Sequence, residues 1–463
     1  MYSQVIQGQR YSFGNLKEVL AKASYLKMGD VVAGIAAQNS KENIAAQMAL
    51  ADISLKDFLN EAVIPYEEDE ISRAIIDHYN AQDFSFFSGF TVGSLRDWIL
   101  SDDFMGNNIQ QAQELLSPEM VAAVSKIMRH QDLIIAAKKI QVVTQFNNTV
   151  GLPNCFSSRL QPNHPTDDLY HIFSAIIEGL LYGSGDALIG INPALDDDAT
   201  VKKMLYALDR FIQVFEIPTQ ACVLNHITQT LRLMEQHVPV HLLFQSIAGS
   251  EKTHQHFGIN LNILNEAYQA ALELPKGKVG NSRTYFETGQ GSCLSANGHH
   301  NVDQQTLEVR AYFVAKRFKP FLINSVVGFI GPEYLSNGDQ IIRAAIEDHF
   351  CGKLLGLPMG VDIGYTNHNI ATQNDIDVAL TMLGSAGCNY IMAIPGSDDI
   401  MLNYQTTSFH DTLFIRKLFG YKPAPEFENW LLGKQIVDHN LKPLCLSGNS
   451  IFKSFLKQYD GRS

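Results

Sequence analysis

The stretch PFLINSVVGFIG, at residues 320–331, is a run of apolar and often β-branched residues that closes on glycine. A longer helix-like stretch follows it, and PMGVDIGYTNH, at residues 358–368, then repeats the pattern. Short β-branched runs that end in turn residues predict buried strands, and a helical stretch between two of them predicts the crossover of a βαβ unit. These two runs therefore predict parallel strands of one sheet.

The same texture occupies the chain from about residue 146, where eight such runs are found. The other six are TVGLPNCFSSRLQ (149–161), DALIGINP (186–193), QACVLNH (220–226), VHLLFQSIAG (240–249), RTYFETGQGS (283–292) and NYIMAIPGSDD (389–399). Successive runs begin roughly 20 to 43 residues apart, which leaves room for a strand, a helix and two loops. The shortest interval, between the third and fourth runs, holds only ITQTLRLMEQHVP and is the weakest unit. Eight units over about 270 residues favour a closed (β/α)8 TIM barrel over an open doubly wound sheet.

The sequence divides into three segments around this barrel. Residues 1–145 are predicted to be mainly helical, because stretches such as SKENIAAQMALADI and PEMVAAVSKIMRHQDLIIAAKKI space apolar residues by three and four. Ser117-Pro118-Glu119 indicates a capped helix start. Residues 146–420 form the predicted barrel with the active site. Residues 421–463 form a C-terminal helical extension, in which PEFENWLLGKQIV is expected to pack on the barrel exterior or on a neighbouring subunit.

Composition excludes several classes of protein. The balance of 35 Lys+Arg against 48 Asp+Glu gives a net charge of −13, without a dense basic stripe, so nucleic acid is not an expected partner. The 6 cysteines form no C-x-x-C pair, which fits reduced thiols better than a zinc knuckle or a disulfide framework. A signal peptide and membrane spans are not indicated, so we expect a cytoplasmic protein without a membrane partner.

Polar residues close each apolar run, where a (β/α)8 barrel carries its active site. They are Arg159, Gln161, Asn192, His226, Gln245, Ser246, Glu287, Gln290, Asn324, Asp362, Ser397, Asp398 and Asp399. One arginine, two separated carboxylates and two amides suit a small ligand with an ammonium at one end and a hydroxyl at the other. Carboxylate and amide oxygens accept from the ammonium, and Arg159 can donate to an oxygen that gains negative charge.

Each of these residues also has a purely structural interpretation. A polar residue at a strand end is often a helix cap or loop anchor, and Asp398 and Asp399 could begin the last barrel helix. Glu287 and Asp362 follow apolar runs where an unpaired carboxylate is costly to bury, although an ion pair with Lys or Arg would also explain them.

Two further features bear on cofactors. The histidines at 164, 226, 349 and 368 are isolated in sequence, and no HxH follows the first strand, so a protein-held metal is not indicated. GQGSCLS lacks the third glycine of a dinucleotide fingerprint, and Gly289 and Gly291 are instead expected to allow close approach of a large flat cofactor.

Eight blocks in order resemble the large subunit of ethanolamine ammonia-lyase: FSSRLQPN, IGINP, FQSIAGSEK, YFETGQGS, VVGFIGPEYL, RAAIEDHF, AGCNYIM and DDIMLNYQTT. The resemblance runs from KEVLAKAS to at least PEFENWL and so covers nearly all the chain. It implies a (β/α)8 barrel that converts ethanolamine to acetaldehyde and ammonia, with adenosylcobalamin lying across the barrel mouth.

The resemblance also implies roles for individual residues. Substrate would be bound by Arg159, Gln161, Asn192, Glu287 and Asp362, of which Glu287, Arg159 and Asp362 would be catalytic. Asn192, Pro193, Ser246, Ser295 and Met401 would face the corrin or adenosyl group. In this scheme Glu287 anchors both substrate ends, Arg159 stabilises negative character on the oxygen, Gln161 and Asp362 hold the amine, and Asn192 holds the hydroxyl.

Partners follow from the same resemblance: a separate small subunit, a hexamer of large subunits arranged as a trimer of dimers, and a location in a bacterial microcompartment as one possibility. The piece EDHFCG (347–352) has Glu347 where the D-x-H-x-x-G cobalamin motif has Asp, and Cys293 and His299-His300 are departures from the family pattern.

Two rival hypotheses stay open. One is a metal-dependent barrel hydrolase that uses Asp362 with histidines, and the other is a non-catalytic paralogue that serves as a scaffold.

Overall fold

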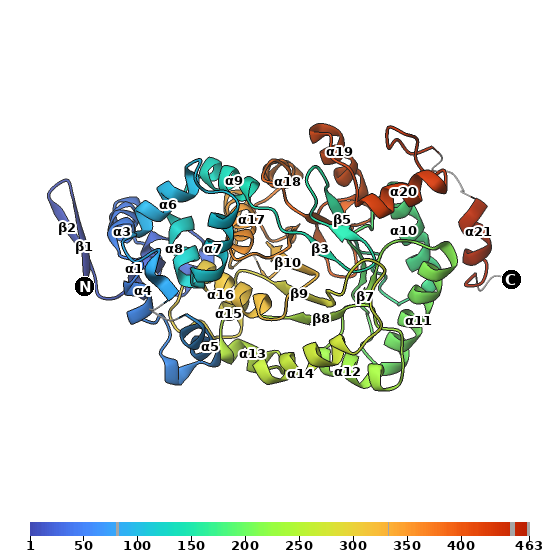
Figure 1. Ribbon diagram of the computed structural model, residues 1–463, viewed down its shortest axis with the longest axis horizontal. Helices are drawn as coiled ribbons and strands as arrows, with labels where there is room; N and C mark the ends of the chain where they lie inside the picture. The colour runs from blue at the N-terminus through green and yellow to red at the C-terminus, as the bar shows by residue number, and fades with distance from the viewer. Residues whose placement is uncertain (80–82, 332, 445–449, 461–463) are drawn as a thin grey trace.

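The computed structural model describes residues 1–79, 83–331, 333–444 and 450–460, and its centre is an eight-stranded parallel sheet curled into a nearly closed barrel (Figure 1). The strands are β5 (Ser157–Leu160), β6 (Leu188–Ile191), β7 (Ala221–Val223), β8 (Leu243–Ser246), β9 (Thr284–Thr288), β10 (Leu322–Val327), β11 (Met359–Ile363) and β12 (Tyr390–Ala393). Their order is β7-β6-β5-β12-β11-β10-β9-β8, and each neighbouring pair is parallel. Every strand lies inside one of the eight predicted runs, so the predicted barrel is confirmed.

Side chains join the two ends of this row, β7 and β8. The Ala221 N–H donates to His241 Nδ1 at 3.1 Å, just before β8, and the Ile227 N–H donates to Gln245 Oε1 at 3.0 Å. The helix between these strands is α12 (Ile227–Glu235), in the interval that the sequence marked as weakest. The seam is thus held by side-chain hydrogen bonds where the strand ladder stops.

Helices surround the strands and alternate with them along the chain. They are α10 (Leu169–Leu181), α11 (Asp198–Phe215), α12, α13 (Glu251–His256), α14 (Leu261–Leu272), α15 (Ser292–Ser295), α16 (Gln304–Lys316), α17 (Gly338–Leu354), α18 (Gln373–Ser385) and α19 (Phe409–Phe419). Successive strand residues face opposite sides. Outward residues such as Leu160 and Phe286 therefore join the helix-covered core, while Tyr285, Tyr390 and Phe244 belong to a separate cluster that fills the barrel interior.

Short elements complete the barrel region. They are β3 (Thr144–Gln145) with β4 (Thr149–Val150), the 3-10 turn η3 (Pro395–Ser397), and β13 (Asp398–Asp399) with β14 (Tyr404–Gln405). Asp398 and Asp399 therefore form a hairpin strand and do not begin the last barrel helix, which starts at Phe409 behind the Ser408 cap.

The N-terminal segment begins with an antiparallel hairpin that projects from the body of the molecule (Figure 1). Its elements are β1 (Tyr2–Ile6), β2 (Gln9–Phe13), α1 (Leu16–Ala23), α2 (Met28–Val32), α3 (Ser40–Asp52), α4 (Asp57–Asn60), η1 (Tyr66–Glu68), α5 (Glu70–His78), η2 (Asp83–Ser85), α6 (Val92–Leu100), α7 (Asn107–Leu115), α8 (Pro118–Lys126) and α9 (His130–Lys139). Ser117 caps α8 as predicted, accepting from the Met120 N–H at 3.3 Å. The helical stretch 118–140 is broken, because Asp132 accepts the Arg129 N–H at 2.9 Å and starts a new helix there.

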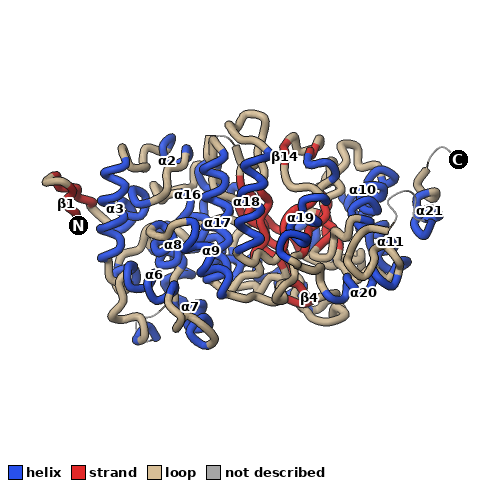
Figure 2. Tube along the Cα trace, turned by 90° about the horizontal axis from the view of Figure 1, so that it is seen from above, coloured by secondary structure: helices blue, strands red, loops and turns tan. Residues whose placement is uncertain are grey.

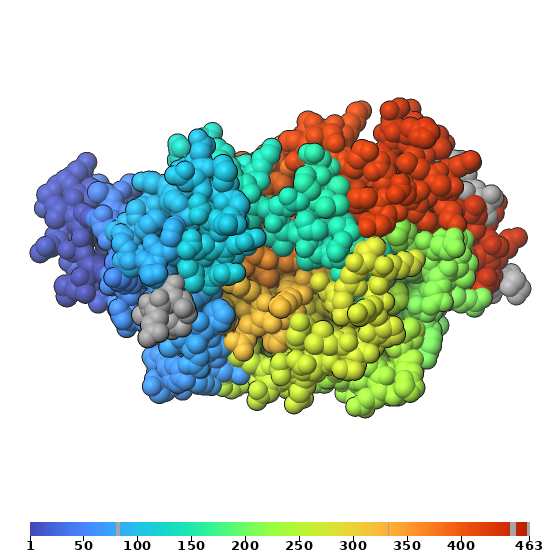
Figure 3. All heavy atoms as spheres, in the orientation of Figure 1, coloured from blue at the N-terminus to red at the C-terminus, as the bar shows by residue number. Residues whose placement is uncertain are grey.

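Buried ion pairs join this segment to the barrel helices. Arg310 of α16 donates to Asp69 and Glu119, each at 2.7 Å, while Lys27 lies 2.6 Å from Glu347. Seen from above, α8 and α9 lie alongside α16 and α17 (Figure 2). In the space-filling view the blue and cyan N-terminal segment abuts the yellow and orange barrel segment (Figure 3).

The C-terminal helices α20 (Pro425–Gly433) and α21 (Ser450–Leu456) pack on the barrel exterior (Figure 1). Trp430 Nε1 donates to the Phe215 carbonyl at 2.8 Å, and the Phe455 ring lies 5.0 Å from that of Phe211. Both contacts are with α11, so α20 packs on the barrel exterior, which is one of the two positions predicted for it. Helix α21 was not predicted. Among the described residues no helix has the length and apolar character needed to cross a bilayer. The five described cysteines are free thiols, and Cys445 lies outside the described residues.

Candidate active site

An ion pair crosses the barrel interior near its carboxyl end. Arg159 Nη1 lies 3.2 Å from Glu287 Oε1, and the two side chains are 1% and 15% exposed. Their strands are β5, third in the sheet order, and β9, seventh, so they stand on opposite sides of the ring. A Cβ on Gly190 of β6 would lie only 2.7 Å from Arg159 Nε, so this glycine makes room for the guanidinium.

Two polar side chains flank Glu287 at the same level of the barrel. Ser246 on β8 and Asn324 on β10 are its register partners on the two neighbouring strands. Asn324 Nδ2 donates to Glu287 Oε1 at 3.2 Å, and the Tyr285 hydroxyl donates to the same oxygen. Glu287 is thus held in place by donors on one oxygen.

Several buried polar atoms at this site have no hydrogen-bond partner among the described residues. They include Arg159 Nε and Nη2, and Asn324 Oδ1. Burial opposes the charge on Arg159, but Tyr285 and Glu287 raise its pKa above the ordinary value, so the guanidinium stays protonated. Buried donors without acceptors are costly, and these atoms therefore indicate a ligand that supplies both an acceptor and a donor.

Asp362 is held by two hydroxyl groups from the hairpin that follows β12. Thr406 Oγ1 donates to Oδ1 at 2.6 Å, and the Tyr404 hydroxyl donates to Oδ2 at 3.0 Å. Burial raises the pKa of Asp362 to about 6, while the Thr406 bond and the Arg159 charge oppose the increase. Asp362 is therefore a carboxylate at neutral pH that takes up a proton under mildly acidic conditions.

Gln161 and Asn192 form a row that leads to Asp362. Asn192 Nδ2 donates to Gln161 Oε1 at 3.0 Å. Gln161 Nε2 donates to Asp399 Oδ2 at 2.8 Å and to the Tyr404 hydroxyl at 3.2 Å. The five side chains predicted to bind substrate therefore converge at one end of the barrel, as an Arg159–Glu287 pair and a row that ends on Asp362.

The residues predicted to face a cofactor lie on segments at the carboxyl ends of the strands. Pro193, Ser246 and Met401 are half-buried, whereas Ser295 is exposed and donates to the Ser292 carbonyl at 2.9 Å. Three large aliphatic side chains stand out on loops of the same end: Leu195 after β6, Ile370 after β11 and Ile400 after β12, which are 62%, 83% and 73% exposed. All three loops follow the carboxyl ends of their strands, so these side chains lie at the same end of the barrel as the polar side chains described above.

The donor set around the mouth does not suit a bare metal ion. No group of three or more His, Cys, Asp or Glu side chains that could hold a metal occurs in the described part of the chain. Asp362, which the rival hydrolase hypothesis requires as a ligand, binds two hydroxyl groups instead.

Two of the strand-end residues, His226 and Gln290, have a purely structural role. His226 anchors loops, with Nδ1 2.8 Å from Thr228 Oγ1 and Nε2 3.0 Å from the Phe257 carbonyl oxygen. Gln290 turns away from the mouth and donates to Glu347 and Asp348 of α17 at 3.0 and 2.8 Å.

The two glycines after β9 are explained by the protein itself. A Cβ on Gly291 would lie 2.6 Å from the Tyr334 ring, and one on Gly289 would lie 2.9 Å from the Val326 carbonyl oxygen. These contacts within the protein are enough to explain both glycines, without the close approach of a flat cofactor. Cys293 is likewise buried, with Sγ 3.6 Å from Ser250 Oγ, and burial raises its pKa.

Three site residues were not singled out from the sequence: Tyr404, Thr406, and Asn163, which donates from Nδ2 to Asp399 Oδ2 at 2.9 Å. Tyr404 and Thr406 lie within the quoted block DDIMLNYQTT, but on a hairpin well beyond the end of β12, so their position after a strand did not mark them. Gly190 and Gly360 did carry a signal, because a glycine inside a strand often marks a close approach of other atoms. Gly190 faces Arg159 and Gly360 faces the Tyr390 ring.

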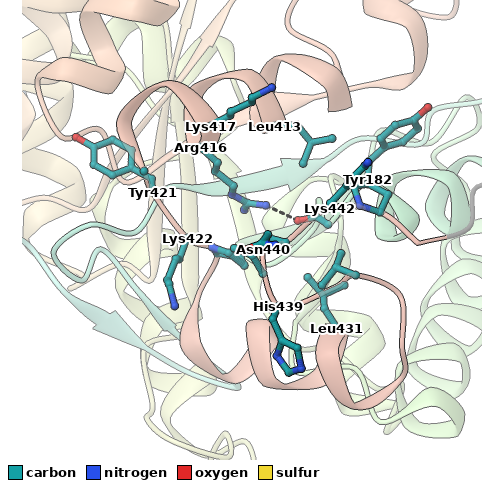
Figure 4. Close-up of a pocket in the computed structure, with 16 residues that line it drawn as sticks. Tyr182, Leu413, Arg416, Lys417, Tyr421, Lys422, Leu431, His439, Asn440 and Lys442 are labelled. Carbon is teal, nitrogen blue, oxygen red and sulfur yellow. Dashed lines mark hydrogen bonds between the residues drawn. The ribbon is translucent and has the colours of Figure 1, made fainter.

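A separate cavity of about 560 Å³ lies at the other end of the barrel (Figure 4). Arg416 at its wall donates to the carbonyls of Gly183 and Phe156, at 2.6 and 2.8 Å, and these residues precede β6 and β5. Barrel enzymes carry their chemistry at the carboxyl ends of the strands, so we assign the site to the mouth and not to this cavity.

The family model described as "Ethanolamine ammonia lyase large subunit (EutB)" matches residues 11–444. The chain belongs to the ethanolamine ammonia-lyase large subunit family. Members of this family deaminate ethanolamine as carbon–nitrogen lyases, which confirms the resemblance found in the sequence. The ethanolamine ammonia-lyase large subunits of Escherichia coli (strain K12) and Salmonella typhimurium are each 47% identical over 424 residues, 92% of this chain and 93% of theirs. The structure of HydG, a maturase of the [FeFe]-hydrogenase, aligns with a TM-score of 0.41 at 12% identity over 83% of this chain and 85% of its own, too distant to inform the activity.

Proposed function

We propose that this chain is the catalytic large subunit of an adenosylcobalamin-dependent enzyme that converts ethanolamine to acetaldehyde and ammonia. The observation that supports this most is the convergence of Arg159, Glu287 and Asp362 with two amides around buried atoms that lack protein partners. The unpartnered N–H groups can donate to a hydroxyl oxygen, and the unpartnered oxygen can accept from an ammonium. Ethanolamine carries both of these groups.

Within this proposal Glu287 is an anchor shared by both ends of the substrate. Arg159 donates from Nε and Nη2 to the substrate oxygen and stabilises the negative charge that develops there. Asp362 and Gln161 hold the ammonium, and Asn192 holds the hydroxyl. Bound adenosylcobalamin would supply the radical chemistry, while the protein orients the substrate and excludes water.

The cofactor would lie over the mouth, against Asn192, Pro193, Ser246, Ser295 and Met401. The exposed aliphatic side chains of Leu195, Ile370 and Ile400 support this placement, because they offer apolar contacts on loops at the same end of the barrel. Ser295 and Ser246 would supply hydroxyl groups to the polar edge of the group.

The partners follow the family. We propose a separate small subunit that completes the enzyme, a hexamer of large subunits arranged as a trimer of dimers, and action in the cytoplasm or inside a bacterial microcompartment. The names of the curated relatives, which are large subunits, support the two-component assembly. Light scattering of the purified complex would measure the number of each subunit.

The decisive experiment is co-expression with a cognate small subunit and an anaerobic assay with adenosylcobalamin and ethanolamine. We expect aldehyde formation that needs both subunits and the cofactor. Stoichiometric zinc with cobalamin-independent hydrolysis would instead favour the metal hydrolase. A folded complex that binds neither ethanolamine nor cofactor would favour the scaffold.

A further inference from the structure

Asp399 stands behind the substrate-facing amides and accepts four hydrogen bonds. Its Oδ2 accepts from Gln161 Nε2 at 2.8 Å and from Asn163 Nδ2 at 2.9 Å. Its Oδ1 accepts from the backbone N–H groups of Met401 and Leu402 at 3.1 and 2.9 Å. The carboxylate is 6% exposed, so protein donors take the place of water around it.

This arrangement fixes which way the neighbouring amides face. An ionised carboxylate only accepts hydrogen bonds, so Gln161 and Asn163 must turn their NH2 groups toward Asp399. Their oxygens then face the other way, and both accept from Asn192. Gln161 Oε1 accepts from Asn192 Nδ2 at 3.0 Å, and Asn163 Oδ1 accepts from the Asn192 backbone N–H at 2.8 Å.

The contact between Gln161 and Tyr404 fits the same direction of hydrogen-bond donation. Its second N–H reaches the Tyr404 hydroxyl at 3.2 Å, and that hydroxyl donates its own hydrogen to Asp362 at 3.0 Å. Donation therefore runs from Asn192 through Gln161 and Tyr404 to Asp362. The side-chain oxygen of Asn192 is left without a partner among the described residues.

We propose that Asp399 is a positioning residue that sets the hydrogen-bond direction of the candidate site, so that Asn192 presents its oxygen as an acceptor to the substrate hydroxyl. This inference rests on the proposed function, because it assumes that ethanolamine occupies the mouth. Such an arrangement makes the site selective for ligands with a hydrogen-bond donor at that end. Asp399 touches neither substrate nor cofactor in this scheme and acts through Gln161 and Asn163.

Asp399→Asn is the primary test, because it keeps the shape and removes two acceptor positions. The backbone N–H groups of Met401 and Leu402 cannot turn round, so the oxygen of the new amide stays on them and its NH2 faces Gln161. Gln161 must then reverse, and Asn192 with it, which presents a donor to the substrate. We expect KM for ethanolamine to rise at least about tenfold, with a smaller change in kcat. The matched control is Asp398→Asn, at the exposed neighbouring carboxylate, which should leave both constants within about twofold.

A second substitution distinguishes a role in hydrogen-bond direction from a general loss of packing. In the double variant Asp399→Asn with Gln161→Glu, the new amide donates to one oxygen of the new carboxylate, and the other oxygen again accepts from Asn192 Nδ2. We expect this double variant to have a lower KM than Gln161→Glu alone, and lower than Asp399→Asn if that single variant folds. A role confined to packing predicts additive losses.

The outcomes distinguish this inference from the proposed function. If the wild-type complex does not turn over ethanolamine, the proposed function fails. If the wild type is active but Asp399→Asn leaves KM and kcat unchanged, the role of Asp399 is wrong. Should Asp399→Asn fail to fold, the double variant decides, because a folded double variant with a KM no better than that of Gln161→Glu overturns the proposal.

Discussion

The Tyr404 hydroxyl donates a 3.0 Å hydrogen bond to the Asp362 carboxylate, joining the hairpin after β12 to the end of strand β11. Both side chains are buried, and Thr406 of the same segment donates to the other carboxylate oxygen at 2.6 Å. The charge on Asp362 therefore depends on a segment that lies outside the barrel strands. Four of the predictions below concern this carboxylate and the ion pair beside it.

We expect kcat/KM for ethanolamine to fall as the pH decreases through about 6. The pKa of Asp362 is raised by burial to about 6, and a protonated carboxyl group no longer attracts the substrate ammonium. Tyr404→Phe removes a donor that favours the charged form, so the acid limb should move to higher pH. A pH profile of kcat/KM for wild type and variant measures both effects. A limb that stays in place or moves to lower pH would contradict the assignment.

Asp362 should also make stability depend on pH. Its pKa rises from 3.8 in the unfolded chain to about 6 in the folded state, so the folded state holds the proton more tightly. Its destabilising contribution is absent below about pH 4, grows as the pH rises toward 6 and is constant above that value. The free energy of unfolding of Asp362→Asn, relative to wild type, should increase over the same window. Urea titrations at several pH values would show this, and a pH-independent difference would refute it.

Glu287→Gln should lower kcat by at least about a hundredfold while the fold is retained. The substitution keeps the shape but removes the charge that lies 3.2 Å from Arg159 and would accept from the substrate. Glu216→Gln, at a surface carboxylate 77% exposed and paired with Lys434, is the control and should keep full activity. Aldehyde formation by the reconstituted complex gives the comparison. Full activity in Glu287→Gln would rule out its assigned role.

Arg159→Lys should reduce kcat/KM by about two orders of magnitude without unfolding the protein. A lysine could still pair with Glu287, but it lacks the planar fork that gives Arg159 its two buried N–H groups without protein acceptors. Circular dichroism should be unchanged, and steady-state kinetics should show the loss. Wild-type kinetics in this variant would mean that the unpartnered groups do not contact substrate.

Arg310→Ala should destabilise the protein by about 3 to 5 kcal/mol, because it leaves Asp69 and Glu119 buried without their partner. Arg232→Ala is the matched control. Arg232 is 55% exposed and lies 3.4 Å from Asp198, so its loss should cost less than about 1 kcal/mol. Chemical denaturation of both variants measures the difference, and equal effects would show that the N-terminal helices do not depend on this contact.

Local sequence was enough to place the eight strands and the side chains that end them. Each strand is a short β-branched run followed by polar residues and a helix, and a residue's position in a strand decides whether it faces inward. Strand position placed Arg159, Gln161, Asn192, Glu287 and Asp362 among thirteen strand-end candidates, and the family resemblance then singled out these five as the substrate set. The family, too, was recognisable from ordered blocks of sequence.

Tertiary structure alone decided which of these residues meet. The pairing of Arg159 with Glu287 follows from ring closure, which sets β5 opposite β9. Tyr404 and Asp399 reach the site on a hairpin that folds back over the mouth, and Arg310 finds its carboxylates on helices from the other end of the chain. Periodicity reports only how a residue faces within its own element. Contacts between distant elements depend on how the chain closes and packs as a whole, which no local pattern encodes.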